Sequence, residues 1–214
     1  MKKFFKKKVA GTALFSKGVY ALSNEERVKI FEETLKISKE YFPHIDSRKY
    51  NNNIKIIWSE NTVKSILEWG GNGRLCALNF ADGYEMGGLV WQGVKTQEED
   101  LCRSSNLYLA LSAISYPIDS SLVYSRDVVF FRDDNLELLK EPVICDVVSC
   151  PSLVKTSDVG EIKRRMRMII ESAKVNGAEM IILGKWGCGT FGNDWGVFKK
   201  LWDEVIEELG CSFV

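Results

Sequence analysis

Two neighbouring glutamates, Glu98 and Glu99, stand at the start of a predicted helix, directly after a glycine-rich stretch. Adjacent residues on a helix point about 100° apart, so these carboxylates cannot easily flank one bond as the paired carboxylates of an ordinary glycosidase do. We therefore expect different roles: one carboxyl group acts as acid or base, and the other holds a substrate hydroxyl. A second interpretation stays open, because Thr96-x-x-Glu99 also has the form of a capping box.

A second candidate site is the glycine-rich loop that follows the apolar run 180–184 and leads into a predicted helix. It reads Gly187-Cys188-Gly189-Thr190-Phe191-Gly192 and formally satisfies GxGxxG. A dinucleotide-binding fold needs an acidic residue about 20 positions further on, at the end of another strand, and only 22 residues remain here. Loop amides beside a helix N-terminus still favour a phosphate or diphosphate, and Phe191 is placed to stack on a sugar or base. A tight turn without a ligand remains the other interpretation.

The composition excludes several classes of protein. With 29 Lys plus Arg against 29 Asp plus Glu, the 214 residues have zero net charge, so there is no excess of cations for binding nucleic acid in bulk. Nucleophile triads and most zinc sites draw on at least one histidine, and the single histidine here, His44, lies far from any Ser-centred motif. We therefore expect no bound metal.

The cysteines and the N-terminus bear on where the protein works. The six cysteines include no CxxC pair, and several lie in apolar runs, which is typical of buried, reduced thiols in a cytosolic protein. No apolar stretch approaches the ~18 residues of a membrane span. The lysine-rich residues 1–22 are expected to form a basic arm rather than a signal peptide, and residues 23–214 a single domain. We expect a cytoplasmic monomer.

Apolar strands and amphipathic helices alternate along the chain. Strands are predicted at 54–58, 75–80, 128–131, 143–148 and 180–183. Helices are predicted at 24–41, after a Ser23-x-x-Glu26 capping box, at 61–69, 97–113 and 194–209, and around an apolar stripe at 162–173 that ends before Gly177. This alternation predicts an α/β layered domain with a mixed, mostly parallel sheet. In such sheets ligands bind where strands end and loops begin.

The residues around the two glutamates resemble a known family. Asn79-Phe80-Ala81, then Gly87-Gly88, then eight residues and Gln97-Glu98-Glu99, are similar to the signature of the bacterial-type poly(ADP-ribose) glycohydrolases, which are macrodomain proteins. Further segments resemble the family in the same order, at 33–35, 124–128, 131–134 and 183–194. The resemblance extends over about residues 24–210.

This resemblance implies a three-layer α/β/α macrodomain-like sandwich that holds ADP-ribose at the strand ends, with no cofactor. It makes Glu99 the catalytic acid and base and Glu98 the residue that orients the ribose. The substrate-binding residues that it implies are Asn79, Ala81, Gly87, Gly88, Gln97, Gly187, Cys188, Gly189, Thr190, Phe191 and Gly192.

The function implied is hydrolysis of a ribose O-glycosidic bond in poly(ADP-ribose) or in a mono-ADP-ribosylated macromolecule, by glutamate acid/base catalysis. Two alternatives are a non-catalytic ADP-ribose reader and a hydrolase of a free ADP-ribose-derived signalling nucleotide. The chain departs from the family pattern at Leu89, where the family has a third glycine, and at Glu85-Met86. We expect Leu89 to narrow the cleft and Glu85 to add negative charge beside the diphosphate.

Overall fold

The computed structural model describes residues 21–41 and 47–214. His44 and most of the expected basic arm lie outside the described residues. Leu22, at the end of that arm, is buried in a small cluster with Ile30 and Leu136.

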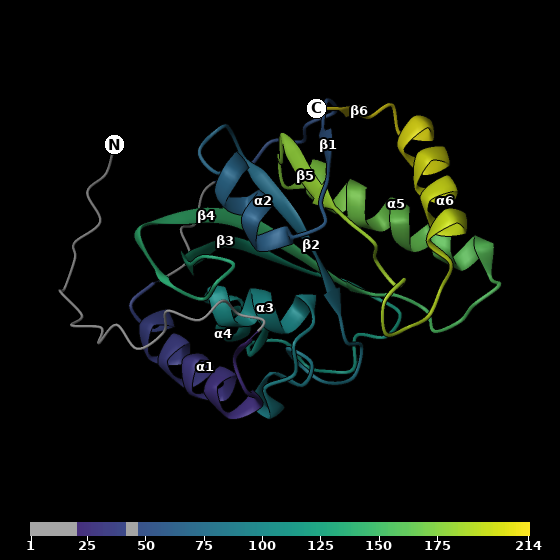
Figure 1. The fold of residues 1–214 in the computed structure, drawn as a ribbon. Helices are drawn as coiled ribbons and strands as arrows, with labels where there is room; N and C mark the ends of the chain where they lie inside the picture. Colours follow the sequence, from purple (N-terminus) through teal and green to yellow (C-terminus); the bar gives the residue numbers. More distant parts are fainter. Residues whose placement is uncertain (1–20, 42–46) are drawn as a thin grey trace.

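The centre of the molecule is a six-stranded sheet with the order β3-β4-β2-β5-β1-β6 (Figure 1). Its strands are β1 (Lys55–Trp58), β2 (Leu75–Ala81), β3 (Val123–Arg132), β4 (Leu138–Pro151), β5 (Met180–Leu183) and β6 (Ser212–Phe213). Only β3 and β4 pair antiparallel, and every other neighbouring pair is parallel. The predicted mixed, mostly parallel sheet is therefore confirmed.

Helices cover both faces of this sheet (Figure 1). They are α1 (Asn24–Ser38), α2 (Thr62–Trp69), α3 (Gln97–Ser104), α4 (Leu107–Leu111), α5 (Val159–Val175) and α6 (Trp195–Glu208), and a short 3-10 helix, η2 (Val90–Gln92), precedes α3. Alternate side chains of β2 enter different cores. Cys76 and Leu78 pack with α5 and α6, whereas Leu75 and Ala77 pack with α1 to α4. The sandwich thus has the three layers that were predicted.

Local signals fix the ends of several helices. The capping box that begins α1 is formed, with Glu26 N–H donating to Ser23 Oγ at 3.2 Å and Ser23 N–H donating to Glu26 Oε2 at 2.7 Å. At the end of α5, Gly177 follows the cap residue Asn176 with φ +73°, as its predicted place requires.

The single helix predicted at 97–113 is wrong, because the chain breaks at Ser105 into α3 and α4. Ser105 is extended, with φ −148°, and forms a β-bridge with Phe130. Its hydroxyl donates to the Leu101 carbonyl at 2.7 Å and accepts from Leu107 N–H at 3.1 Å. A serine hydroxyl that binds nearby backbone groups competes with the helix, which explains the break.

The sheet opens between its two central strands. β2 and β5 pair only over residues 75–77 and 180–182. Beyond these residues β2 continues beside β4 as far as Ala81, while β5 continues beside β1 as far as Leu183. The two strands part at their carboxyl ends, and this is where a parallel α/β sheet forms a ligand crevice.

Candidate active site

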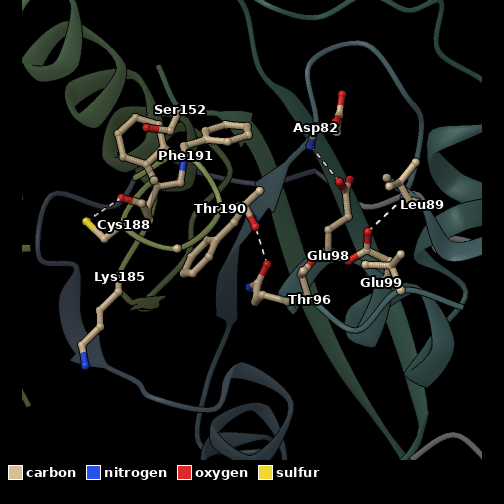
Figure 2. Close-up of a pocket in the computed structure, with 17 residues that line it drawn as sticks. Asp82, Leu89, Thr96, Glu98, Glu99, Ser152, Lys185, Cys188, Thr190 and Phe191 are labelled. Atoms are coloured by element: carbon tan, nitrogen blue, oxygen red, sulfur yellow. Dashed lines mark hydrogen bonds between the residues drawn. The ribbon is translucent and has the colours of Figure 1, made fainter. Parts of the chain in front are cut away.

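A cleft of about 420 Å³ lies at the carboxyl ends of β2 and β5. Figure 2 shows its two walls facing each other, with Glu98 and Glu99 on one side and Cys188, Thr190 and Phe191 on the other. The lining residues are Phe80, Asp82, Gly88, Leu89, Val94, Thr96, Gln97, Glu98, Glu99, Ser152, Lys185, Trp186, Gly187, Cys188, Gly189, Thr190 and Phe191. The fold thus brings the two sites predicted from the sequence together in one cavity.

Glu98 is held by two donors behind the cleft. Its side chain accepts from the Asn79 amide at 3.1 Å, through Oε1, and from Asp82 N–H at 2.7 Å, through Oε2. Burial raises the pKa of Glu98 to about 8, although these two hydrogen bonds favour the charged form. Glu98 therefore keeps its proton at a pH where an exposed glutamate is ionised.

Glu99 is equally buried, with 3 % of the residue exposed, and faces a different set of partners. Its Oε1 accepts from Leu89 N–H at 2.9 Å, and its Oε2 contacts the hydroxyl of Thr96. Thr96 makes no side-chain hydrogen bond to the backbone of α3. The capping-box interpretation of Thr96 and Glu99 is therefore wrong, since both side chains turn to each other and to the loop instead.

Gly87 and Gly88 have different structural roles. A Cβ on Gly88 (φ +59°) would lie 2.5 Å from Glu99 Oε1, so only a glycine lets the backbone approach this carboxylate. A Cβ on Gly87 (φ +70°) would instead lie 2.7 Å from the ring of Tyr108. Gly87 therefore supports the packing of the loop, and it does not line the cleft.

The chain departs from the family pattern at Leu89 and at Glu85, on either side of the Gly87-Gly88 pair. Leu89 has φ −96°, which any residue adopts, so its backbone reaches Glu99 without a glycine. Its side chain is 40 % exposed and lines the cleft, where it was expected. Glu85 is exposed and does not line the cleft, so its charge beside the diphosphate stays a prediction.

The remaining predicted residues on this wall are structural neighbours of the glutamates. Gln97 accepts from Phe80 N–H at 2.8 Å and donates to the Leu78 carbonyl at 2.8 Å, which fixes the start of α3 to the end of β2. Asn79 lies behind Glu98, and Ala81 is fully buried. Of these three residues, only Gln97 lines the cleft.

The opposite wall is the loop after β5. Its residues from Gly187 to Phe191 line the cleft, while Gly192 packs against Lys155 instead. The first turn of α6 is capped by Asp194, whose Oδ1 accepts from Val197 N–H at 2.8 Å. The cleft is lined by the loop itself, and no residue of α6 lines it.

The cysteine of this loop is a poor nucleophile. Burial raises the pKa of the Cys188 thiol to about 11, so it stays protonated near neutral pH. Cys188 contributes shape and backbone to the wall.

Several lining residues were not found from the sequence, among them Asp82, Ser152 and Lys185. Asp82 and Ser152 each come directly after a buried parallel strand, β2 and β4 respectively. That position was a usable signal, because parallel strands end together at the ligand edge of a sheet. Lys185 is exposed at the rim, where its Nζ donates to Glu60 at 3.1 Å.

Comparison with known proteins agrees with this geometry. The family model for the microbial-type PARG catalytic domain, where PARG is poly(ADP-ribose) glycohydrolase, matches residues 10–133, more than half of the chain. The chain belongs to this family. The resemblance first inferred from the motif is thus confirmed, and the protein is a glycohydrolase.

Solved structures of PARG proteins have the same fold. The PARG of Thermomonospora curvata bound to the inhibitor ADP-HPD is 26% identical, with a TM-score of 0.67 over 89% of this chain and 92% of that chain. The PARG of Deinococcus radiodurans in complex with ADP-ribose is 25% identical, with a TM-score of 0.67 over 90% of this chain and 84% of that chain. A comparison with curated proteins gave no match.

Two further findings concern the described part of this PARG-family chain. Across residues 21–41 and 47–214, no three His, Cys, Asp or Glu side chains are grouped so that they could hold a metal ion. Within the same ranges, no helix is long and apolar enough to cross a membrane.

Proposed function

We propose that this PARG-family protein releases ADP-ribose from poly(ADP-ribose) or from a mono-ADP-ribosylated macromolecule, with Glu98 and Glu99 as its catalytic pair. One observation carries the proposal: two buried carboxyl groups line a cleft whose opposite wall is a glycine-rich loop. The relatives in complex with ADP-ribose and with ADP-HPD support ADP-ribose as the ligand of this cleft.

Glu99 is the acid and base in this proposal. In the first step its protonated carboxyl group donates a proton to the oxygen that leaves the anomeric carbon of the ribose, as the C–O bond breaks through an oxocarbenium-like state. In the second step its carboxylate takes a proton from the water that attacks the same carbon. The Thr96 hydroxyl suits both states, because a hydroxyl can donate to a carboxylate or accept from a carboxylic acid.

Glu98 orients the ribose. Both of its oxygens accept from N–H groups, which cannot reverse their direction, so its position is fixed more strictly than that of Glu99. A fixed carboxyl group at the cleft surface suits the binding of a ribose hydroxyl. The raised pKa of Glu98, about 8, favours a second assignment in which the proton of the pair resides on Glu98 and the roles reverse.

The glycine-rich loop holds the rest of the substrate. The backbone amides of Gly187, Gly189, Thr190 and Phe191 are donors for the diphosphate, whereas Cys188 N–H donates to the Lys185 carbonyl at 3.0 Å. The half-buried Phe191 ring offers a face for a sugar or base. Amide donors carry no net charge, so a protein of zero net charge can still bind a dianion.

The test is release of free ADP-ribose from poly(ADP-ribose), from mono-modified protein and from mono-modified nucleic acid. We expect Glu99→Gln to lower kcat about a thousandfold while ADP-ribose binding changes little, because only the proton transfer is lost. Glu98→Gln is the matched variant. Loss of activity in Glu98→Gln with normal turnover in Glu99→Gln would reverse the roles. A wild type that binds ADP-ribose in calorimetry yet releases none from any substrate would be a reader and not an enzyme.

We further propose that the protein acts in the cytoplasm as a monomer. All six cysteines are free, and Cys76, Cys102, Cys145 and Cys150 are buried, which suits a reducing compartment. Light scattering after size-exclusion chromatography should give the mass of one 24.3 kDa chain. A mass of two chains would refute the monomer.

A further inference from the structure

A buried hydroxyl group in the cleft wall has no partner in the described part of the protein. Ser152 follows β4 directly and lines the cleft, yet only 8 % of the residue is exposed. Its Oγ is fully enclosed and makes no hydrogen bond to any described residue. An unpaired buried hydroxyl is destabilising, so its presence at a binding surface calls for an explanation in the bound state.

The neighbours of this hydroxyl point to its ligand. A Cβ on Gly187 would lie 2.1 Å from Ser152 Oγ, so the hydroxyl rests directly against the first residue of the glycine-rich loop. Asn193 ties the two segments together, since its amide donates to the Leu153 carbonyl at 2.7 Å and to the Gly187 carbonyl at 2.8 Å. Ser152 thus belongs to the loop wall of the cleft, across from Glu98 and Glu99 (Figure 2).

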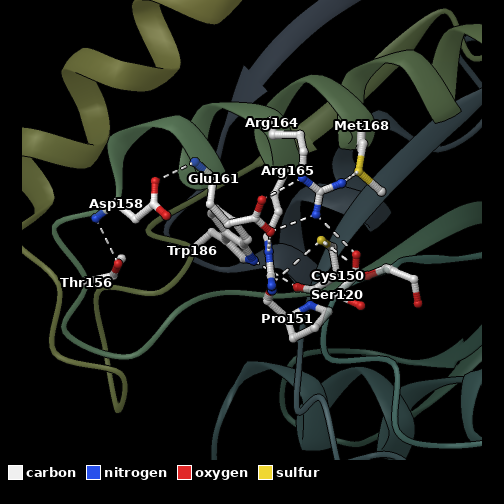
Figure 3. A network of polar contacts seen from close by, with 11 residues as sticks. Ser120, Cys150, Pro151, Thr156, Asp158, Glu161, Arg164, Arg165, Met168 and Trp186 are labelled. Atoms are coloured by element: carbon white, nitrogen blue, oxygen red, sulfur yellow. Dashed lines mark hydrogen bonds and ion pairs between the residues drawn. The ribbon is translucent and has the colours of Figure 1, made fainter.

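A network of hydrogen bonds fixes Cys150 and Pro151, the two residues before Ser152 (Figure 3). The carbonyl of Pro151 accepts from the buried guanidinium of Arg165 at 2.8 Å, and the carbonyl of Cys150 accepts from the indole of Trp186 at 2.9 Å. Glu161 in turn accepts from Arg165 Nε at 2.7 Å. The two residues before Ser152 are therefore fixed to α5 and to the base of the loop, which preorganises the hydroxyl for a ligand.

We propose that Ser152 is a substrate-binding residue whose hydroxyl donates a hydrogen bond to a diphosphate oxygen of the substrate. The inference rests on the proposed function, which places the diphosphate at this wall. A neutral donor with free hydrogen-bonding capacity, held against the amide-lined loop, suits an anionic oxygen, because hydrogen bonds to charged groups are the strong ones. This residue deepens the site by adding a buried side-chain donor to the backbone amides and the exposed Thr190 of the same wall.

The test uses Ser152→Ala with Ser125→Ala as the matched control. Ser125 is also a buried serine on a strand, β3, but it does not line the cleft. We expect Ser152→Ala to raise the Kd for ADP-ribose about tenfold in calorimetry, and to raise the Kd for ADP by the same factor. Ser125→Ala should leave both Kd values within twofold of wild type.

The Tm of the ligand-free protein is a second measurement, and it is not expected to fall together with the ligand affinity. Removing an unpaired buried hydroxyl should leave the Tm of the ligand-free protein unchanged or slightly higher, even as ligand affinity falls. A Tm that falls further for Ser152→Ala than for Ser125→Ala would show that the hydroxyl supports the fold, and would overturn the inference.

Other outcomes separate this inference from the function on which it rests. An unchanged Kd for ADP-ribose in Ser152→Ala would overturn the role of Ser152 and leave the proposed function standing. A loss confined to ADP-ribose, with ADP binding unchanged, would place the hydroxyl at the distal ribose and overturn the diphosphate assignment. A wild type that binds no ADP-ribose would instead refute the proposed function.

Discussion

The two walls of the cleft differ in their burial and in the hydrogen-bond partners of their polar groups. On the β2 side, Glu98 and Glu99 are nearly fully buried, and each of their four carboxyl oxygens has a protein partner. On the β5 side, Gly189 and Thr190 are exposed, and the wall offers loop amides together with the buried, unpaired hydroxyl of Ser152. This contrast matches the proposed function, in which one wall transfers protons and the other holds an anion.

The arrangement of each wall suits the role proposed for it. Proton transfer needs a carboxyl group whose pKa and direction are set by burial and fixed donors. Binding a diphosphate needs several donors that remain available in the free protein. Three further variants or conditions test this contrast, in addition to those of Glu99 and Ser152.

The largest effect is expected for Gly88→Ala. The added methyl group would lie 2.5 Å from Glu99 Oε1 at a backbone φ of +59°, so the loop must shift and the carboxylate with it. We expect kcat to fall at least a hundredfold, measured as release of ADP-ribose, with a loss of about 1 to 2 kcal/mol in the free energy of unfolding. Leu89→Ala is the control, because φ −96° accommodates alanine, and its kcat should stay within threefold of wild type. Equal activity of Gly88→Ala and wild type would mean that the carboxylate wall tolerates displacement.

The second-largest effect is expected on the free energy of unfolding, which should depend on pH because of Glu98. Burial raises its pKa from 4.5 to about 8, so between these pH values the folded protein binds one more proton than the unfolded chain. Stability should therefore fall as the pH rises through this window and level off above about 8. From pH 5.5 to 8 the contribution is about 3 kcal/mol.

Urea denaturation at several pH values measures this slope. Glu98→Gln should lose it, because glutamine does not titrate. Glu137→Gln, an exposed substitution outside the cleft, should keep the wild-type slope. The same slope in Glu98→Gln and wild type would show that Glu98 is not the buried group that retains its proton.

The smallest effect is expected on the loop wall, for Gly187→Ala. Gly187 has φ +75°, and a Cβ there would collide with Ser152 Oγ, whereas Gly189 has open space around it. We expect Gly187→Ala to raise KM about tenfold with kcat changed less than threefold, since this wall binds and does not transfer protons. Gly189→Ala should behave as wild type. A fall in kcat without a change in KM would break the distinction between the walls.

Much of the fold followed from local patterns. The apolar runs at 75–80 and 180–183 predicted buried parallel strands, and their side chains do alternate between two helical layers. The break at Ser105 was missed because the helical pattern of apolar residues continues through this position. The hydroxyl of Ser105 competes locally with the helix, and the extended backbone there also bridges to Phe130, a residue distant in the sequence that spacing does not reveal.

The site divides in the same way. The available chemistry can be read from the residues alone: two adjacent carboxyl groups, glycines able to adopt positive φ, and a single histidine. The surroundings of these groups depend on the folded chain. In the folded protein, Asn79 and Asp82 donate hydrogen bonds to Glu98. Thr96 does not cap the helix with its side chain, and the hydroxyl of Ser152 lies beside Gly187. The physical reason is that a pKa, like an unpaired donor, depends on burial and on neighbours from other strands, which spacing along one chain segment does not specify.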